Sequence, residues 1–126
     1  MINATFGWAW ITVGLAGGLG MALFFAREDW LGGYPSWPRR LLRLGHVACV
    51  GLGALNVLFA VSAVWLHLPR LWLRADCGLW IAGAVTMPLA CVIAAARPKW
   101  PALVVFAVPL ACLLAAGAVT AWGMPR

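Results

Sequence analysis

Residues 45–68 read GHVACVGLGALNVLFAVSAVWLHL and contain no Asp, Glu, Lys or Arg. The hydrocarbon core of a bilayer is roughly 30 Å thick, and a helix that rises about 1.5 Å per residue crosses it with about 20 apolar residues. At 24 residues, this stretch is long enough to span a membrane. We therefore predict that it forms a transmembrane helix.

Three further charge-free stretches of similar length flank this one, at about residues 4–26, 78–96 and 101–122. All nine Lys and Arg and all three Asp and Glu lie outside the four stretches. Segments that cross hydrocarbon must pair every backbone polar group internally, which a helix does by itself. The sequence predicts an all-α integral membrane protein, with residues 1–126 forming a single domain folded as an antiparallel four-transmembrane-helix bundle.

The composition excludes a water-soluble fold. Hydrophobic residues make up 65% of the 126-residue chain and charged residues only 10%, whereas a soluble domain carries roughly 25% charged residues. The net charge of +6 is divided between the two ends of the predicted helices, so there is no single basic surface and we exclude nucleic acid as a partner. The nine tryptophans are typical of the aromatic belts at membrane interfaces.

The basic residues also predict the orientation of the chain. Because cytoplasmic loops are enriched in Lys and Arg, six positive charges in the first and third loops against three elsewhere favour a non-cytoplasmic position for both termini. We expect a bacterial inner membrane. The six are Arg27, Arg39, Arg40, Arg43, Arg97 and Lys99, and the three are Arg70, Arg74 and Arg126.

The basic cytoplasmic loop, residues 27–44, is the longest connection in the predicted bundle. Ser36, followed closely by a proline, is positioned to start a helix within it. Clustered basic side chains at a cytoplasmic surface attract anionic lipids. Arg39, Arg40 and Arg43 are therefore candidate ligands of lipid headgroups.

Small residues predict close contacts between the helices. Gly14 and Gly18 form a small-xxx-small pair in the first helix, and Gly51 is a similar position in the second. Such faces allow helix backbones to approach one another. They serve packing within one chain as well as association with another.

Two prolines lie inside the third and fourth predicted helices, each within the sequence Pro-Leu-Ala-Cys that starts at Pro88 and again at Pro109. A proline inside a helix kinks it and leaves the carbonyl four residues earlier without its helical partner. The two free carbonyls, at Ala84 and Val105, would lie at similar depth. Two paired kinks of this kind are one basis for a small dimeric channel or carrier.

The two histidines, His46 and His67, are the candidate cofactor ligands. They are 21 residues apart, which is about 31 Å along a helix, so they cannot share one metal ion. Imidazole is a common axial ligand of haem. A haem with two histidine ligands would need a second subunit, whereas the magnesium of a chlorin needs only one. The alternative for both residues is an interfacial or hydrogen-bonding role.

Other polar residues offer little chemistry. Asn56 lies deep in the second predicted helix, where an amide is costly unless it pairs with another helix. The four cysteines include no CxxC pair, so no metal site is predicted. Asp76 is expected to cap the third helix from the loop before it. With no Asp or Glu inside a predicted span, a proton relay based on a carboxylate is not expected.

Three functions remain open. The preferred one is a non-catalytic accessory or scaffold subunit of a larger membrane complex, of the energy-transducing kind, whose partners are the lipid bilayer and other membrane subunits or further copies of the chain. The second is a membrane subunit that binds haem or a chlorin through His46. The third is the small dimeric channel or carrier. We predict no catalytic residues and no enzymatic activity.

Overall fold

The computed structural model describes residues 2–125, so the charge expected at Arg126 lies outside the described residues. The elements are α1 (Ile2–Phe25), a short 3-10 helix η1 (Trp30–Gly32), α2 (Trp37–Ser62), α3 (Arg70–Ala96) and α4 (Ala102–Gly123). Each of the four α-helices is long and apolar enough to cross a membrane. The prediction of an all-α, four-helix membrane protein is confirmed.

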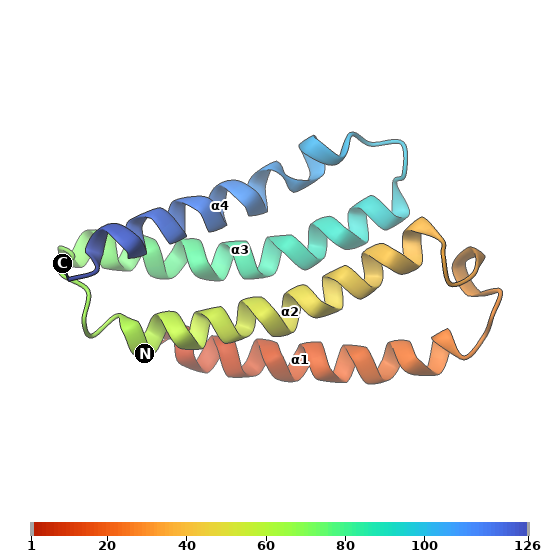
Figure 1. Ribbon diagram of the computed structural model, residues 1–126, viewed down its shortest axis with the longest axis horizontal. Coiled ribbons are helices and arrows are strands. Elements are labelled where there is room, and N and C mark those ends of the chain that lie inside the picture. Colours follow the sequence, from red (N-terminus) through yellow and green to blue (C-terminus); the bar gives the residue numbers. More distant parts are fainter. Residues whose placement is uncertain (1, 126) are drawn as a thin grey trace.

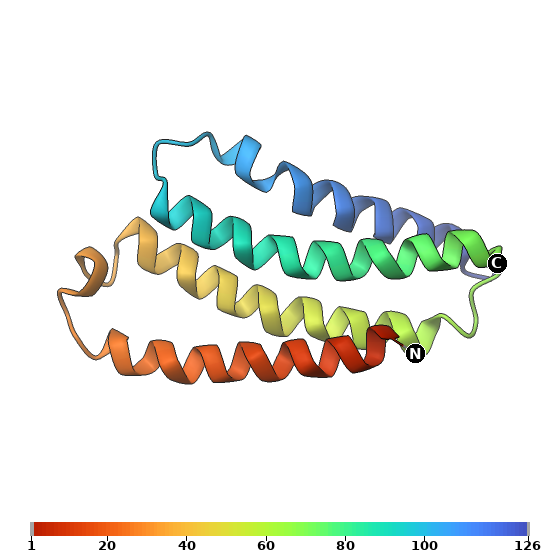
Figure 2. The ribbon, with the colours of Figure 1, turned by 180° about the vertical axis from the view of Figure 1, so that it is seen from behind.

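The four helices lie side by side in a row and alternate in direction (Figures 1 and 2). Each packs mainly on the next along the chain, and α1 makes a smaller contact with α3. Both ends of the chain lie at the end of the bundle that also holds the α2–α3 linker (Figure 1). We call this the termini end, and the opposite end, with the other two connections, the loop end.

The two middle helices begin earlier than their charge-free stretches. α2 starts at Trp37 rather than at residue 45 and ends at Ser62 rather than at residue 68. Ser36 caps it, because the Ser36 hydroxyl accepts a hydrogen bond from the backbone N–H of Arg39 at 3.4 Å. The second half of the predicted loop 27–44 is therefore helical. The physical reason is that charged residues are tolerated in the turns of a helix that project beyond the hydrocarbon.

α3 differs from the prediction in the same way. It starts at Arg70, directly after Pro69, rather than at Gly78. Pro69 is the N-cap residue of α3, with φ −56° and ψ 147°, and proline is tolerated there because it has no N–H to leave unpaired. Asp76 is consequently part of α3, and the expectation that no carboxylate lies inside a helix is wrong.

The helices meet through small residues. The backbones of α1 and α2 approach so closely at Gly7 and Gly53 that a Cβ atom on Gly7 would lie 2.5 Å from the carbonyl oxygen of Gly53. Gly14 likewise faces Cys49 and Val50. Large aliphatic side chains point outward instead, as Leu19 and Leu103 do with 71% and 79% of their surface exposed. This arrangement is typical of a bundle whose outer surface contacts lipid.

Candidate functional site

A polar network ties α1, α2 and α3 together near the termini end. The side-chain amide of Asn3 donates hydrogen bonds to Oδ1 of Asn56 at 2.9 Å and to the backbone carbonyl of Cys77 at 3.1 Å. The amide of Asn56 in turn donates to the backbone carbonyls of Leu52 and Trp80, at 2.9 and 3.2 Å. Asn3 and Asn56 are both buried. Their amides therefore find partners inside the bundle, as apolar surroundings require.

The network continues from α3 to α4. The indole N–H of Trp80 donates to the hydroxyl oxygen of Thr120 at 3.1 Å, and that hydroxyl donates to Oδ2 of Asp76 at 2.8 Å. Asp76 is completely buried, and its other oxygen, Oδ1, has no hydrogen-bond partner among residues 2–125. The carboxyl group of Asp76 is the one acidic side chain that the structure places inside the bundle.

The sequence does not identify most of this network. Asp76 was expected to cap a helix from a loop. Thr12 and Thr86 bond to the turn before them, at 2.9 and 2.7 Å, whereas Thr120 bonds to Asp76. A start of the third helix at Pro69 would have placed Asp76 and Trp80 on one helix face, four residues apart. No sequence signal pairs either of them with Thr120, which lies on another helix.

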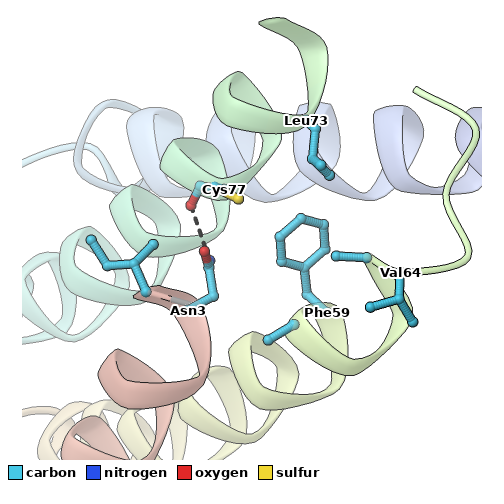
Figure 3. A pocket seen from close by; sticks show the side chains of 8 residues that line it. Asn3, Phe59, Val64, Leu73 and Cys77 are labelled. Atoms are coloured by element: carbon cyan, nitrogen blue, oxygen red, sulfur yellow. Dashed lines mark hydrogen bonds between the residues drawn. The ribbon is translucent and has the colours of Figure 1, made fainter. Parts of the chain in front are cut away.

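A pocket of about 270 Å³ lies beside the network at the termini end (Figure 3). Figure 3 shows the amide of Asn3 at one wall, where it bonds to the carbonyl of Cys77, with Phe59 and Leu73 nearby. The lining is almost entirely apolar, and consists of Ile2, Asn3, Phe59, Ala60, Ala63, Val64, Leu73 and Cys77. Nothing in this lining points to a charged ligand.

His46 lies between α1 and α2. Its Nδ1 atom is 2.8 Å from the carbonyl oxygen of Gly14, and its ring packs so closely on Gly18 that there is no room for a Cβ atom at that position. Within residues 2–125, the other nitrogen, Nε2, has no hydrogen-bond partner. The ring lines a groove of about 220 Å³ that also includes Met21 of α1 and Val92 of α3.

The other candidate ligand, His67, does not lie on a helix. It belongs to the linker at residues 63–69, its side chain is exposed, and its backbone N–H donates to the carbonyl of Gly123 at 2.8 Å. In the described part of the chain, no group of three His, Cys, Asp or Glu side chains is arranged to hold a metal ion. His46 is therefore the one histidine placed between helices.

The arginines at the loop end have different roles. Arg39 is 2% exposed, donates to the backbone carbonyls of Arg27 and Trp30, and lies over the rings of Phe25 and Trp30. It therefore holds the loop 26–36 against α2 and does not face the lipid. Arg43 lies 4.4 Å from the centre of the Tyr34 ring. The exposed Arg40 remains the freest of the three to reach a lipid headgroup.

α3 and α4 continue through their internal prolines, Pro88 and Pro109. The carbonyl of Ala84, which lacks its helical partner because of Pro88, accepts a hydrogen bond from the indole N–H of Trp10 at 3.0 Å. This carbonyl is therefore occupied by α1. It does not combine with the carbonyl of Val105 into a polar spot between α3 and α4.

Of the glycines expected to pack, Gly51 has no atom within 4 Å of a Cβ built on it. It lines an apolar groove of about 620 Å³ whose walls are α2 and α4 and whose lining includes Met87 of α3, the helix between them. The remaining lining residues are Leu44, Val47, Ala48, Leu52, Leu55, Phe106 and Leu113.

The fold and composition together define an integral membrane protein of the four-helix-bundle class. A scan against protein-family models finds no match to the chain, and searches of curated proteins and of solved structures find none either.

Proposed function

We propose that the chain is a small, non-catalytic accessory subunit of a larger membrane complex. The observation that carries this proposal is the groove between α2 and α4, which is apolar, opens to the outside of the bundle and includes the uncovered Gly51. A glycine without a neighbour allows the backbone of another helix to come close. The proposed occupant is an apolar transmembrane helix of a partner subunit.

The use of polar groups within the chain supports the same function. The amides of Asn3 and Asn56, the hydroxyl of Thr120 and the indole of Trp80 all bond to other helices of the bundle. These bonds stabilise the arrangement of the four helices, each by about 0.6 kcal/mol on average. Such side chains serve as a scaffold and leave the outer faces apolar for contacts with lipid or protein.

Extraction in a mild detergent followed by native gel electrophoresis tests the proposal. We expect the chain to migrate with partner subunits, and Gly51→Leu to release it because the new side chain fills the groove. Gly20→Leu is the matched control, since Gly20 also has open space around it but lies on α1, outside the groove. A wild-type chain that migrates alone, or equal release by both variants, contradicts the proposal.

A second candidate function is the binding of a haem or a chlorin by His46. Histidines that ligate metals commonly use one ring nitrogen for a backbone carbonyl and the other for the metal. The contact of Nδ1 with Gly14 and the unpaired Nε2 fit this pattern. The groove beside His46 has a volume of about 220 Å³, which is small for a tetrapyrrole. A bound tetrapyrrole would therefore also contact lipid or a second subunit. A visible absorption spectrum of the purified protein tests this candidate.

A further inference from the structure

We propose that Asp76 is a proton-binding site, and that its Oδ1 atom holds a proton exchanged with the solution at the termini end of the bundle. The starting observation is a completely buried carboxyl group with one oxygen bonded to Thr120 and the other without a partner among the described residues. This property goes beyond the role of an accessory subunit.

The directions of the hydrogen bonds favour Oδ1 as the oxygen that takes the proton. An indole N–H can only donate, so the oxygen of Thr120 accepts from Trp80. In the structure, the hydroxyl hydrogen of Thr120 donates to Oδ2 of Asp76. A proton on Oδ1 keeps this bond as it is, with Oδ2 as the acceptor. The remaining oxygen, Oδ1, carries either the proton or an unpaired negative charge.

An unpaired carboxylate is costly in apolar surroundings, because it loses its hydration and gains no counter-charge. α1 carries no ionisable side chain, α4 carries only Cys112, two turns from Thr120, and the charged residues of α2 lie at the loop end. Among residues 2–125, the ionisable neighbours at the termini end are Arg70, Arg74 and Cys77 of α3 and His67 of the linker. None of them donates a hydrogen bond to Oδ1.

The proposed occupant of this site is a proton rather than a metal cation. A cation needs several ligands at once, and within residues 2–125 no group of three His, Cys, Asp or Glu side chains could hold a metal ion. A proton needs only the one oxygen that is free. The neutral acid removes the unpaired charge and leaves the bonds to Thr120 and Trp80 intact.

The position of Asp76 determines the side from which the proton comes. Asp76 lies six residues after the first residue of α3, which is about 9 Å along the helix. Both Arg70 and Arg74 before it are exposed. The solution at the termini end is therefore much nearer than that at the loop end.

Infrared spectroscopy of the protein in lipid bilayers tests this site directly. At neutral pH we expect the carbonyl stretch of a protonated carboxylic acid, shifted to lower frequency in deuterated water. Asp76→Asn should abolish the band completely. Asp29→Asn should leave it unchanged, because Asp29 is exposed in the loop 26–36. Thr120→Val should move the band to higher frequency through loss of a hydrogen bond, and Thr120→Ser should restore it.

The chain has only three acidic side chains, Glu28, Asp29 and Asp76. The double variant Glu28→Gln/Asp29→Asn therefore leaves Asp76 as the sole acidic side chain and decides the assignment even if Asp76→Asn does not fold. A band that persists in this double variant supports the site. Absence of the band at neutral pH, its survival in Asp76→Asn, or its loss on addition of Na⁺ at constant pH overturns the proposal, the last in favour of a cation site.

Discussion

The indole N–H of Trp10 donates a hydrogen bond of 3.0 Å to the carbonyl oxygen of Ala84, 74 residues further along the chain. This carbonyl has no partner within α3, because the residue four positions later is Pro88. A proline in one helix thus creates the acceptor that a tryptophan of another helix uses. In hydrocarbon, where no water is present to bond to the carbonyl, this arrangement connects α1 to α3.

The first prediction concerns this bond. Trp10→Phe should lower the free energy of unfolding by about 0.6 kcal/mol, the average for hydrogen bonds between membrane helices, and by at most about 1.7 kcal/mol. In a Pro88→Ala background the loss should be smaller, because residue 88 then supplies the N–H that Ala84 lacks. Reversible unfolding in mixed micelles measures both values. Trp8→Phe is the control, since Trp8 is 62% exposed, and equal losses in the two backgrounds contradict the prediction.

A second prediction concerns the paired amides of Asn3 and Asn56. Asn56→Leu should destabilise the bundle by about 1–3 kcal/mol, because it leaves the amide of Asn3 with one partner fewer. The double variant Asn3→Leu/Asn56→Leu should be less destabilised than the sum of the two single variants, since both buried polar groups are removed together. A double-mutant cycle with the same unfolding assay tests this expectation. Additive losses would show that the two residues act separately.

A third prediction concerns Arg39. Arg39→Lys should free the loop 26–36, because a single ammonium group cannot reach both carbonyls with the geometry of a guanidinium. Hydrogen bonds to charged groups contribute about 1.5–3 kcal/mol, so amide hydrogen exchange in the loop should quicken by about tenfold or more. Mass spectrometry of residues 27–36 measures this rate. Arg40→Lys is the matched control on the exposed side of α2, and it should leave the rate unchanged.

A fourth prediction concerns His46 and follows from the second candidate function. If Nε2 ligates a tetrapyrrole, the purified protein should show a Soret or chlorin absorption band. His46→Ala should abolish this band because the axial ligand is lost. His67→Ala should leave it intact, since His67 lies in the linker 63–69 with its side chain exposed. A colourless wild-type protein, or a band that survives in His46→Ala, removes this candidate.

Much of the fold could be predicted from the sequence because membrane spans have a simple physical signature. Long apolar stretches such as residues 101–122 need only hydrophobicity and length to be recognised. The start of α2 after Ser36 is indicated by the sequence, whereas the start of α3 at Arg70 was less predictable, since its first arginines were treated as a boundary. In the structure Arg39, Arg70 and Arg74 lie within the first turns of their helices, where a charge can remain outside the hydrocarbon.

The candidate site was only partly predictable. Asn56 is recognisable because an amide at membrane depth needs a partner, yet the sequence does not say which one. Thr12 and Thr86 bond to the preceding turn, whereas Thr120 meets Trp80 and Asp76. The three threonines look alike in sequence. They differ because only one of them faces polar groups of a neighbouring helix.

By itself, the sequence determined that this protein is a four-helix membrane bundle, because hydrophobicity and length are properties of each segment alone. Only the tertiary structure decided that Asp76 is buried beside Thr120, that Trp10 bonds to Ala84, and that Arg39 turns inward. These contacts depend on how far one helix is shifted and rotated against the next. That register is set by the close packing of all four helices, so it cannot be read from any one of them.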